Sequence, residues 1–335
     1  MLLRRAVLFG SRFGPVHAHA AKSRHRVHTC STSSLLQNLQ LGKDINVEVQ
    51  TIEVASRTVQ VLVADCDAVM EMYIAAGQGD RDPYWTCVWP SSVAMAEEIL
   101  ARPELVAGRR VADLGCGLGV GGVAAAMAGA AEVVLLDREP LAIQCALINA
   151  KLNGFHEVSC LGEVQVDVQV DVEQRALETW TSLSTSSATV PLSHHKRNPQ
   201  TNIRWSVFDW SARLNDALVG RFDVILACDV LYEQFSVEPV GMVVPKLLRN
   251  GRSGEDSRLL LCDPPLRAKH NREAFIQLMN GQGYVAEECG ERQASVFNET
   301  KRVHDQVPIV FMSFRHASMG DTVGVKRTGW AGLGI

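Results

Sequence analysis

The stretch VADLGCGLGVGGVAAAMAGAAEVVLLDRE, from Val111 to Glu139, decides the fold class of this chain. It predicts an apolar strand, a glycine-rich turn, a helix of small residues, and a second apolar strand that ends at an acidic residue. A strand–loop–helix–strand unit of this kind belongs to a parallel sheet, and open sheets of this class bind ligands outside the carboxyl ends of their strands. We therefore expect a nucleotide-like ligand at this loop.

The same alternation of strands and helices continues on both sides of the stretch. Strands are expected near 110–114, 132–136, 204–208, 222–228, 258–262, 284–289 and 307–315, and helices near 66–79, 91–101, 120–130, 139–153, 235–249 and 271–281. Residues 45–65 alternate apolar and polar side chains and predict a short two-strand β lead-in. The last apolar segment, VPIVFMSFR, has no helix after it, which suggests a hairpin strand inserted at the end of the sheet. The predicted class is α/β, Rossmann-like, with a mostly parallel seven-stranded sheet covered by helices on both faces.

Three segments differ in composition from this pattern. Residues 1–43 contain seven Lys and Arg residues, four His residues and no acidic residue, which is typical of an organelle transit peptide. The mitochondrion is favoured as its destination; a plastid, or a cytoplasmic protein with a basic disordered tail, are the alternatives. Residues 162–203 are rich in polar residues and predict a disordered insertion, and residues 318–335 predict a flexible tail. A single folded domain is thus expected over residues 44–317.

The charge of the chain restricts its partners. The whole chain has a net charge of −4, but residues 44–335 hold 26 basic and 37 acidic residues, a net charge of −11. An acidic body disfavours a nucleic acid as partner, because binding to phosphates needs a basic surface. It favours a protein partner with a basic, lysine-containing segment. No apolar run reaches the ~18 residues that a membrane span needs, so we expect no membrane partner. A monomer is the expected oligomeric state.

The nine cysteines are scattered along the chain, without a C-x-x-C pair or a Cys/His cluster of zinc spacing. Several of them lie in expected buried strands. We therefore expect reduced cysteines, no disulfide and no metal.

Two ligands are compatible with the glycine loop. Gly117, Gly119 and Gly122, followed by Asp137, fit the dinucleotide pattern G-x-G-x-x-G. Asp113, Gly115, Gly117 and Gly119 fit the pattern D-x-G-x-G-x-G of an S-adenosylmethionine loop. A pyrophosphate needs a helix N-terminus and backbone N–H groups, whereas S-adenosylmethionine carries an ammonium and a sulfonium, near which Asp113 is useful. Asp137 can accept hydrogen bonds from ribose hydroxyls in either case.

Motifs on either side of the loop favour the second ligand. The strand FDVILACDVLYE, from Phe222 to Glu233, contains a D-x-x-Y motif; TCVWP lies upstream of the loop, and FDWS follows another strand. This combination resembles the family 16 protein methyltransferases, seven-stranded class I enzymes that mostly methylate lysine in specific non-histone proteins. The resemblance covers residues 45–316 apart from the 162–203 insertion.

The resemblance implies S-adenosyl-L-methionine as cofactor and a lysine side chain of a protein as acceptor. It assigns Asp229 and Tyr232 to the methyl-transfer end. Cys228 departs from the family pattern, which usually has Ala or Ser before the aspartate. Together with the loop pattern, the resemblance implies a cofactor site. Its residues are Trp89, Asp113, Gly115, Cys116, Gly117, Gly119, Asp137, Asp209, Trp210 and Cys228. Asn149 and Asn153, in the next expected helix, are expected to cap or face solvent.

Other functions stay open at this point. A small-molecule methyltransferase and a catalytically silent S-adenosylmethionine-binding partner protein would share the same cofactor half, and a dehydrogenase would share the glycines. The segment Asp263-Pro264-Pro265-Leu266 resembles the D-P-P-Y motif of amino-methylating nucleic-acid enzymes. It follows the fifth expected strand and ends in leucine, so we interpret it as a turn from a strand into a helix.

Overall fold

The computed structural model of the chain describes residues 47–79, 81–161, 201–249, 257–298 and 303–317. The predicted transit peptide, the predicted tail and most of the predicted insertion lie outside the described residues. Among those that are described, no helix combines the length and the apolar character that crossing a membrane requires.

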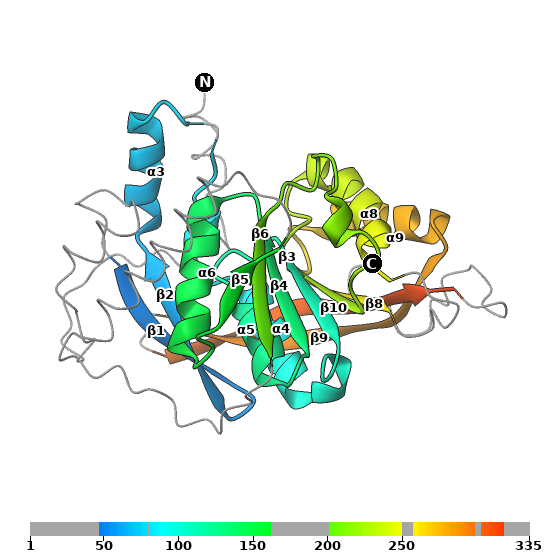
Figure 1. The fold of residues 1–335 in the computed structure, drawn as a ribbon, viewed down its shortest axis with the longest axis horizontal. Helices are drawn as coiled ribbons and strands as arrows, with labels where there is room; N and C mark the ends of the chain where they lie inside the picture. The colour runs from blue at the N-terminus through cyan, green and yellow to red at the C-terminus, as the bar shows by residue number, and fades with distance from the viewer. Residues whose placement is uncertain (1–46, 80, 162–200, 250–256, 299–302, 318–335) are drawn as a thin grey trace.

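A central sheet of eight strands organises the fold (Figure 1). Its order is β5-β6-β4-β3-β7-β8-β10-β9, and all neighbours are parallel except the two pairs made by β10. The strands are β3 (Arg110–Leu114), β4 (Glu132–Asp137), β5 (Val158–Cys160), β6 (Asn202–Val207), β7 (Val224–Cys228), β8 (Arg258–Asp263), β9 (Tyr284–Asn298) and β10 (Val303–His316). Insertion of antiparallel β10 between β8 and β9 confirms the predicted terminal hairpin, and the rest of the sheet is parallel, as the alternation of strands and helices predicts.

Three sequence expectations need correction. The sheet has an eighth strand because Val158–Cys160 pairs in parallel with β6, a segment too short to give a periodic signal. The predicted insertion ends before residue 203, since β6 begins at Asn202 and Ile203 is buried. β9 and β10 are longer than expected because they pair with each other along most of their length, well beyond the edge of β8.

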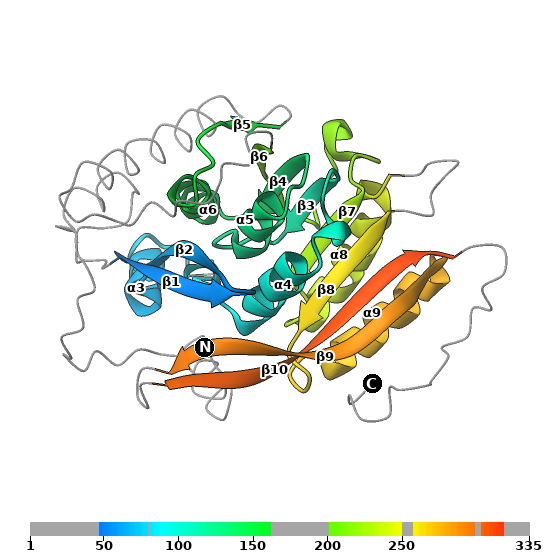
Figure 2. The same ribbon diagram turned by 90° about the horizontal axis from the view of Figure 1, so that it is seen from below.

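Helices cover both faces of the sheet, as the α/β pattern predicts (Figure 2). Residues of α4 (Pro90–Ala101), α5 (Val120–Met127) and α6 (Pro140–Leu152) form one apolar core. Residues of α8 (Gln234–Leu247) and α9 (Lys269–Gly281) form the other. The two cores share the sheet between them, so the carboxyl edge of the parallel strands is held on both sides.

The N-terminal part of the described chain packs onto the first core. It comprises the hairpin of β1 (Val47–Val54) and β2 (Arg57–Ala64), the helix α3 (Cys66–Ala75), and a single 3₁₀ turn, η2 (Tyr84–Thr86). Two further 3₁₀ turns, η3 (Pro103–Leu105) and η4 (Asp216–Leu218), connect other elements.

Two buried asparagines of α6 fix the edge of the hairpin. Asn149 Oδ1 accepts the backbone N–H of Leu62 at 2.6 Å, and Asn153 Oδ1 accepts that of Gln60 at 3.0 Å. The expectation of solvated or N-capping asparagines was therefore wrong: both side chains satisfy donors on β2 that no neighbouring strand could reach, and Asn153 is the C-cap of α6.

Candidate functional site

The loop after β3 is built from glycines in a left-handed backbone conformation. Gly115, Gly117 and Gly119 have φ angles of +67°, +51° and +74°. Gly119 is also the N-cap of α5, and a Cβ there would lie 2.9 Å from the Cβ of Ala146. Residues with side chains rarely adopt these φ values, so all three positions strongly favour glycine. Gly122 lies in the first turn of α5, where the dinucleotide pattern also places its third glycine, so the choice between the two ligands depends on the residues around the loop.

Two buried aspartates hold this loop in place. Asp137, the last residue of β4, accepts the N–H of Gly117 at 2.8 Å and that of Glu139 at 2.9 Å. Asp113 accepts the N–H of Gly122 at 2.7 Å in the first turn of α5. Burial raises the pKa of Asp113 to about 7 and that of Asp137 to about 6. Asp137 thus adjoins the loop as predicted, whereas Asp113 lies beneath it and anchors the helix.

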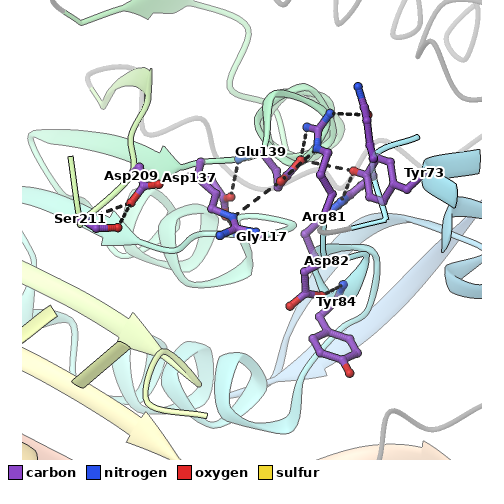
Figure 3. A network of polar contacts seen from close by, with 12 residues as sticks. Tyr73, Arg81, Asp82, Tyr84, Gly117, Asp137, Glu139, Asp209 and Ser211 are labelled. Atoms are coloured by element: carbon purple, nitrogen blue, oxygen red, sulfur yellow. Dashed lines mark hydrogen bonds and ion pairs between the residues drawn. The ribbon is translucent and has the colours of Figure 1, made fainter. Parts of the chain in front are cut away.

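A pocket of about 400 Å³ adjoins Asp137 (Figure 3). It is lined by Arg81, Arg138, Glu139, Val207 and Asp209. The Glu139 carboxylate is ion-paired with Arg81 and accepts the hydroxyl of Tyr73 at 3.4 Å. Arg81 and Glu139 were not predicted from the sequence; the position of Glu139 two residues after the strand-end Asp137 was the available signal.

Trp210 and Gly115 lie against each other on the opposite side of the loop. A Cβ on Gly115 would be 3.1 Å from Cζ3 of Trp210 and 3.2 Å from Cγ1 of Val230. The indole from the β6 end and the residue after Asp229 therefore both contact the glycine loop. Cys116 is buried in the loop, and Cys228 ends β7 directly before Asp229.

An acidic and aromatic cluster surrounds Tyr232, which the resemblance assigns to the methyl-transfer end. Tyr232 donates a hydrogen bond to Asp82 at 3.2 Å. The ring of Tyr84 meets the rings of Trp89 and Tyr232 edge-on, with centroids 5.9 and 6.2 Å apart. Trp89 Nε1 donates to the backbone oxygen of Tyr84 at 2.9 Å, which fixes the orientation of the indole. The structure thus brings Trp89 and Tyr232, predicted from motifs 143 residues apart, around one tyrosine.

Arg267 links this cluster to Asp229. Its guanidinium forms an ion pair with the Asp229 carboxylate and lies 5.1 Å from the centroid of the Trp89 ring. Burial raises the pKa of Asp229, and Arg267 opposes that shift. Arg267 directly follows the Asp263–Leu266 segment, which forms a turn between β8 and α9 as expected. No motif in the sequence indicates that this arginine reaches the site.

Asp263 is a second buried carboxyl group beside Asp229. Neither of its oxygens has a hydrogen-bond partner, and burial together with the charge of Asp229 raises its pKa to about 7. The two aspartates are neighbours because Cys228 and Cys262 pair in register on adjacent parallel strands.

The geometry fits S-adenosylmethionine. A turn with three glycines in the left-handed conformation lets the backbone approach a ligand closely. Asp137 ends the second strand beside a pocket that Glu139 and Asp209 line together with two arginines. In the portion of the chain that the structure describes, no group of three or more His, Cys, Asp and Glu residues is placed to hold a metal ion.

Comparisons with known proteins also find similarity to methyltransferases. The family model "Ribosomal protein L11 methyltransferase (PrmA)" matches residues 93–177. The chain is 39% identical over 90 residues to an electron transfer flavoprotein beta subunit lysine methyltransferase of Danio rerio, covering 27% of this chain and 35% of the relative. It is 33% identical over 128 residues to that of Xenopus laevis, covering 38% of this chain and 48% of the relative. The alignments thus span between about a third and a half of the relatives' own length.

Among solved structures, one described as "Conversion of a Disulfide Bond into a Thioacetal Group during Echinomycin Biosynthesis" is 16% identical, with a TM-score of 0.45, covering 76% of this chain and 94% of that one. The assignment of this chain to the α/β class therefore rests on the strand order and the mostly parallel pairing of its own sheet. The relatives are named as lysine methyltransferases and the matching family model describes a methyltransferase, so both agree with the resemblance predicted from the motifs over the part of the chain that they match.

Proposed function

We propose that this protein transfers methyl groups from S-adenosylmethionine to a lysine side chain of a specific protein. The observation that carries the proposal is the meeting of Asp229, Tyr232 and Trp89 in one cluster, at the sheet edge that also holds the glycine loop. The catalytic domain is proposed to span residues 44–317 and to act as a monomer.

The cofactor half is proposed to bind between the glycine loop and the pocket beside Asp137. Asp137 would accept hydrogen bonds from the ribose hydroxyls, and Asp209 and Trp210 would border the adenine. Gly115, Cys116 and Gly117 would pass close to the methionine end, next to Trp89. When bound, S-adenosylmethionine supplies an electrophilic methyl group on a cationic sulfonium.

The acceptor half has the chemistry that a lysine needs. A free lysine has a pKa of ~10.4, so the ammonium must lose a proton before its nitrogen attacks the methyl carbon. Asp229 can hold and orient the incoming lysine ammonium. Burial beside a cationic sulfonium lowers the pKa of that ammonium, and its proton leaves to water. The faces of Tyr84 and Trp89 can contact the methylated cation, and the hydrogen bond to Asp82 orients Tyr232. The enzyme would act by positioning and exclusion of water rather than by covalent chemistry.

The substrate is proposed to be a protein with an accessible lysine in a basic segment, since residues 44–335 carry a net charge of −11. The beta subunit of electron transfer flavoprotein, which the similar proteins are named for, is the first acceptor to test. We further propose delivery to the mitochondrion, which is supported by the basic, acid-free composition of residues 1–43.

A radiolabel experiment tests the proposal. The full chain is incubated with tritiated S-adenosylmethionine and either the purified beta subunit or extracts of mitochondria, plastids and cytosol. A labelled protein whose label maps to lysine supports the proposed function. Label in small molecules alone would instead indicate a small-molecule methyltransferase, and tight cofactor binding with no label would indicate a silent binding protein.

A further inference from the structure

Two cysteines from separate elements meet beside the acceptor cluster. Cys66 is the first residue of α3, and Cys87 follows the 3₁₀ turn η2, two residues before Trp89. Both are half-buried, and both thiols lie at the same turn, Cys66 against the backbone oxygen of Pro83 and Cys87 against the hydroxyl of Thr86. The 20 residues between them include the rest of α3, so the sequence alone does not indicate that the two cysteines lie at the same turn.

The backbone carbonyl of Pro83 accepts hydrogen bonds from Cys66 and from Thr86, the neighbour of Cys87. Cys66 Sγ donates to the backbone oxygen of Pro83 at 3.9 Å, and the Thr86 hydroxyl donates to the same oxygen at 2.9 Å. The Thr86 oxygen also lies 3.6 Å from Cys87 Sγ. Both sulfurs are therefore held around one point by neighbouring polar groups, instead of packing independently among apolar side chains.

The two sulfurs differ in acidity. The neighbouring Cys66 thiol lowers the pKa of Cys87 to about 7, whereas the pKa of Cys66 is raised. Cys87 thus has a large thiolate fraction near neutral pH, and the thiolate is the reactive form of cysteine. An accessible thiolate beside a second thiol is the arrangement in which a sulfenic acid is resolved to a disulfide.

A second cysteine pair provides an internal contrast. Cys228 and Cys262 are paired in register on β7 and β8. Burial raises the pKa of both well above the ordinary value, and Cys262 is fully buried. Proximity alone is therefore not what distinguishes Cys66 and Cys87; they combine proximity with exposure and polar contacts.

We propose that Cys66 and Cys87 are a redox-active pair that closes to an intramolecular disulfide when the protein meets a hydroperoxide. The Cys87 thiolate attacks one peroxide oxygen and, with a proton, gives a sulfenic acid and one water. The Cys66 sulfur then attacks the sulfenic sulfur, the S–S bond forms, and the S–O bond breaks to release a second water. One hydrogen peroxide is reduced by two electrons and the two thiols are oxidised.

The bond would tie α3 to the segment that carries the acceptor aromatics. Cys87 donates its backbone N–H to the oxygen of Tyr84, the same oxygen that accepts from Trp89 Nε1. Moving Cys87 towards Cys66 would therefore shift the carbonyl that orients the Trp89 ring. This consequence rests on the proposed function, but formation of the disulfide does not.

Mass spectrometry of the full chain tests the site without any activity measurement. The reduced protein is treated with one equivalent of hydrogen peroxide, quenched, and digested without reductant. We expect a loss of about 2 Da from the intact protein and one cross-linked peptide pair joining Cys66 to Cys87, reversed by dithiothreitol. In Cys66→Ser, Cys87 should instead be trapped as a sulfenic acid by dimedone, and Cys87→Ser should suppress both products.

Cys289 supplies the matched control, because it is also half-buried but burial raises its pKa to about 11. Cys289→Ser should leave unchanged both the rate of oxidation by hydrogen peroxide and the cross-link between Cys66 and Cys87. Oxidation of Cys289 before Cys87, or cross-links that join Cys66 or Cys87 to other cysteines, would overturn the proposal. So would a native protein in which the pair stays reduced at a peroxide excess.

A methyl-transfer assay on the oxidised protein then tests the consequence. A KM for the acceptor protein that rises severalfold on oxidation, with cofactor affinity unchanged, and that returns with dithiothreitol, supports the link to Trp89. An unchanged KM in a fully cross-linked sample would refute the link while leaving the disulfide site established.

Discussion

Asp229 has a backbone conformation that residues other than glycine seldom adopt. Its φ angle is +56°, directly after β7, and its carboxylate is almost fully buried against Arg267. Local strain of this kind costs on the order of 1–3 kcal/mol and is maintained only where the surrounding structure fixes the residue. The motif D-x-x-Y marked this position, but the strain and the arginine are properties of the folded chain.

Replacing Asp229 by Asn tests its charge with little change in shape. We expect methyl transfer to fall by roughly 10²-fold or more, because loss of an electrostatic partner in a buried site has effects of that order. Cofactor affinity, measured by calorimetry, should stay within about threefold, since other residues form that half of the site. The exposed Asp216 offers the control substitution Asp216→Asn. Turnover at the normal rate in Asp229→Asn would refute the assigned role.

Arg267→Ala tests the ion pair through the pH dependence of the rate. Arg267 lowers the pKa of Asp229 against the effect of burial. Without the arginine that pKa moves up, so the pH above which the ionised carboxylate supports methyl transfer should also move up. The measurement is the acid limb of kcat/KM against pH, and Arg267→Lys, which keeps a positive charge, should shift it less. An acid limb that stays in place in Arg267→Ala would show that Asp229 ionisation does not govern it.

At the scale of elements, α5 packs on the sheet at a distance that only glycine permits. A Cβ on Gly122 would lie 2.6 Å from Cδ2 of Leu135 and 3.1 Å from the Asp113 carboxylate. Leu135 is fully buried in the core, so the surroundings have little room to give way. The glycines of this stretch therefore serve two purposes: those of the loop allow its left-handed turn, and Gly122 allows the close approach of the helix.

Gly122→Ala is therefore expected to destabilise the protein by about 1–3 kcal/mol through overpacking. Gly281, the last residue of α9, provides a matched control because a Cβ there meets nothing within 4 Å. Gly281→Ala should be neutral or stabilising by up to about 1 kcal/mol. Chemical denaturation of both variants compares the free energies of unfolding, and equal stability in the two would contradict the packing argument.

For the whole molecule, buried carboxyl groups make stability depend on pH. Asp263 has an ordinary pKa of 3.8 and a pKa of about 7 in the folded chain. Between these values the folded state retains a proton that the unfolded state has released, so the free energy of unfolding falls as pH rises through this window. Asp113 and Asp137 act in the same direction, because burial raises their pKa to about 7 and about 6.

Asp263→Asn removes one of these groups. We expect the decline in unfolding free energy between pH 4 and pH 7 to become shallower by up to about 1.4 kcal/mol per pH unit. Denaturant titrations at a series of pH values give this slope, and a surface substitution such as Asp216→Asn should not alter it. A slope identical to that of the unchanged protein would mean that Asp263 does not hold a proton in the folded state.

The sequence by itself determined the sheet core, the helices on its two faces and the position of the glycine loop, because apolar periodicity and glycine placement are local properties of the chain. It also located Asp137, Asp229 and Tyr232, since strand ends and short motifs are visible in a linear sequence. The lengths of β9 and β10 and the extra strand β5 were decided by pairing between distant segments.

Only the tertiary structure decided which other groups join the site. Arg267 reaches Asp229 across a turn, Asn149 and Asn153 bind the edge of β2 from α6, and Cys66 meets Cys87 between α3 and η2. Each of these contacts depends on the relative placement of two elements whose sequences carry no shared pattern. Contacts of this kind are set by how the elements pack in three dimensions, and the local periodicity of the chain does not encode them.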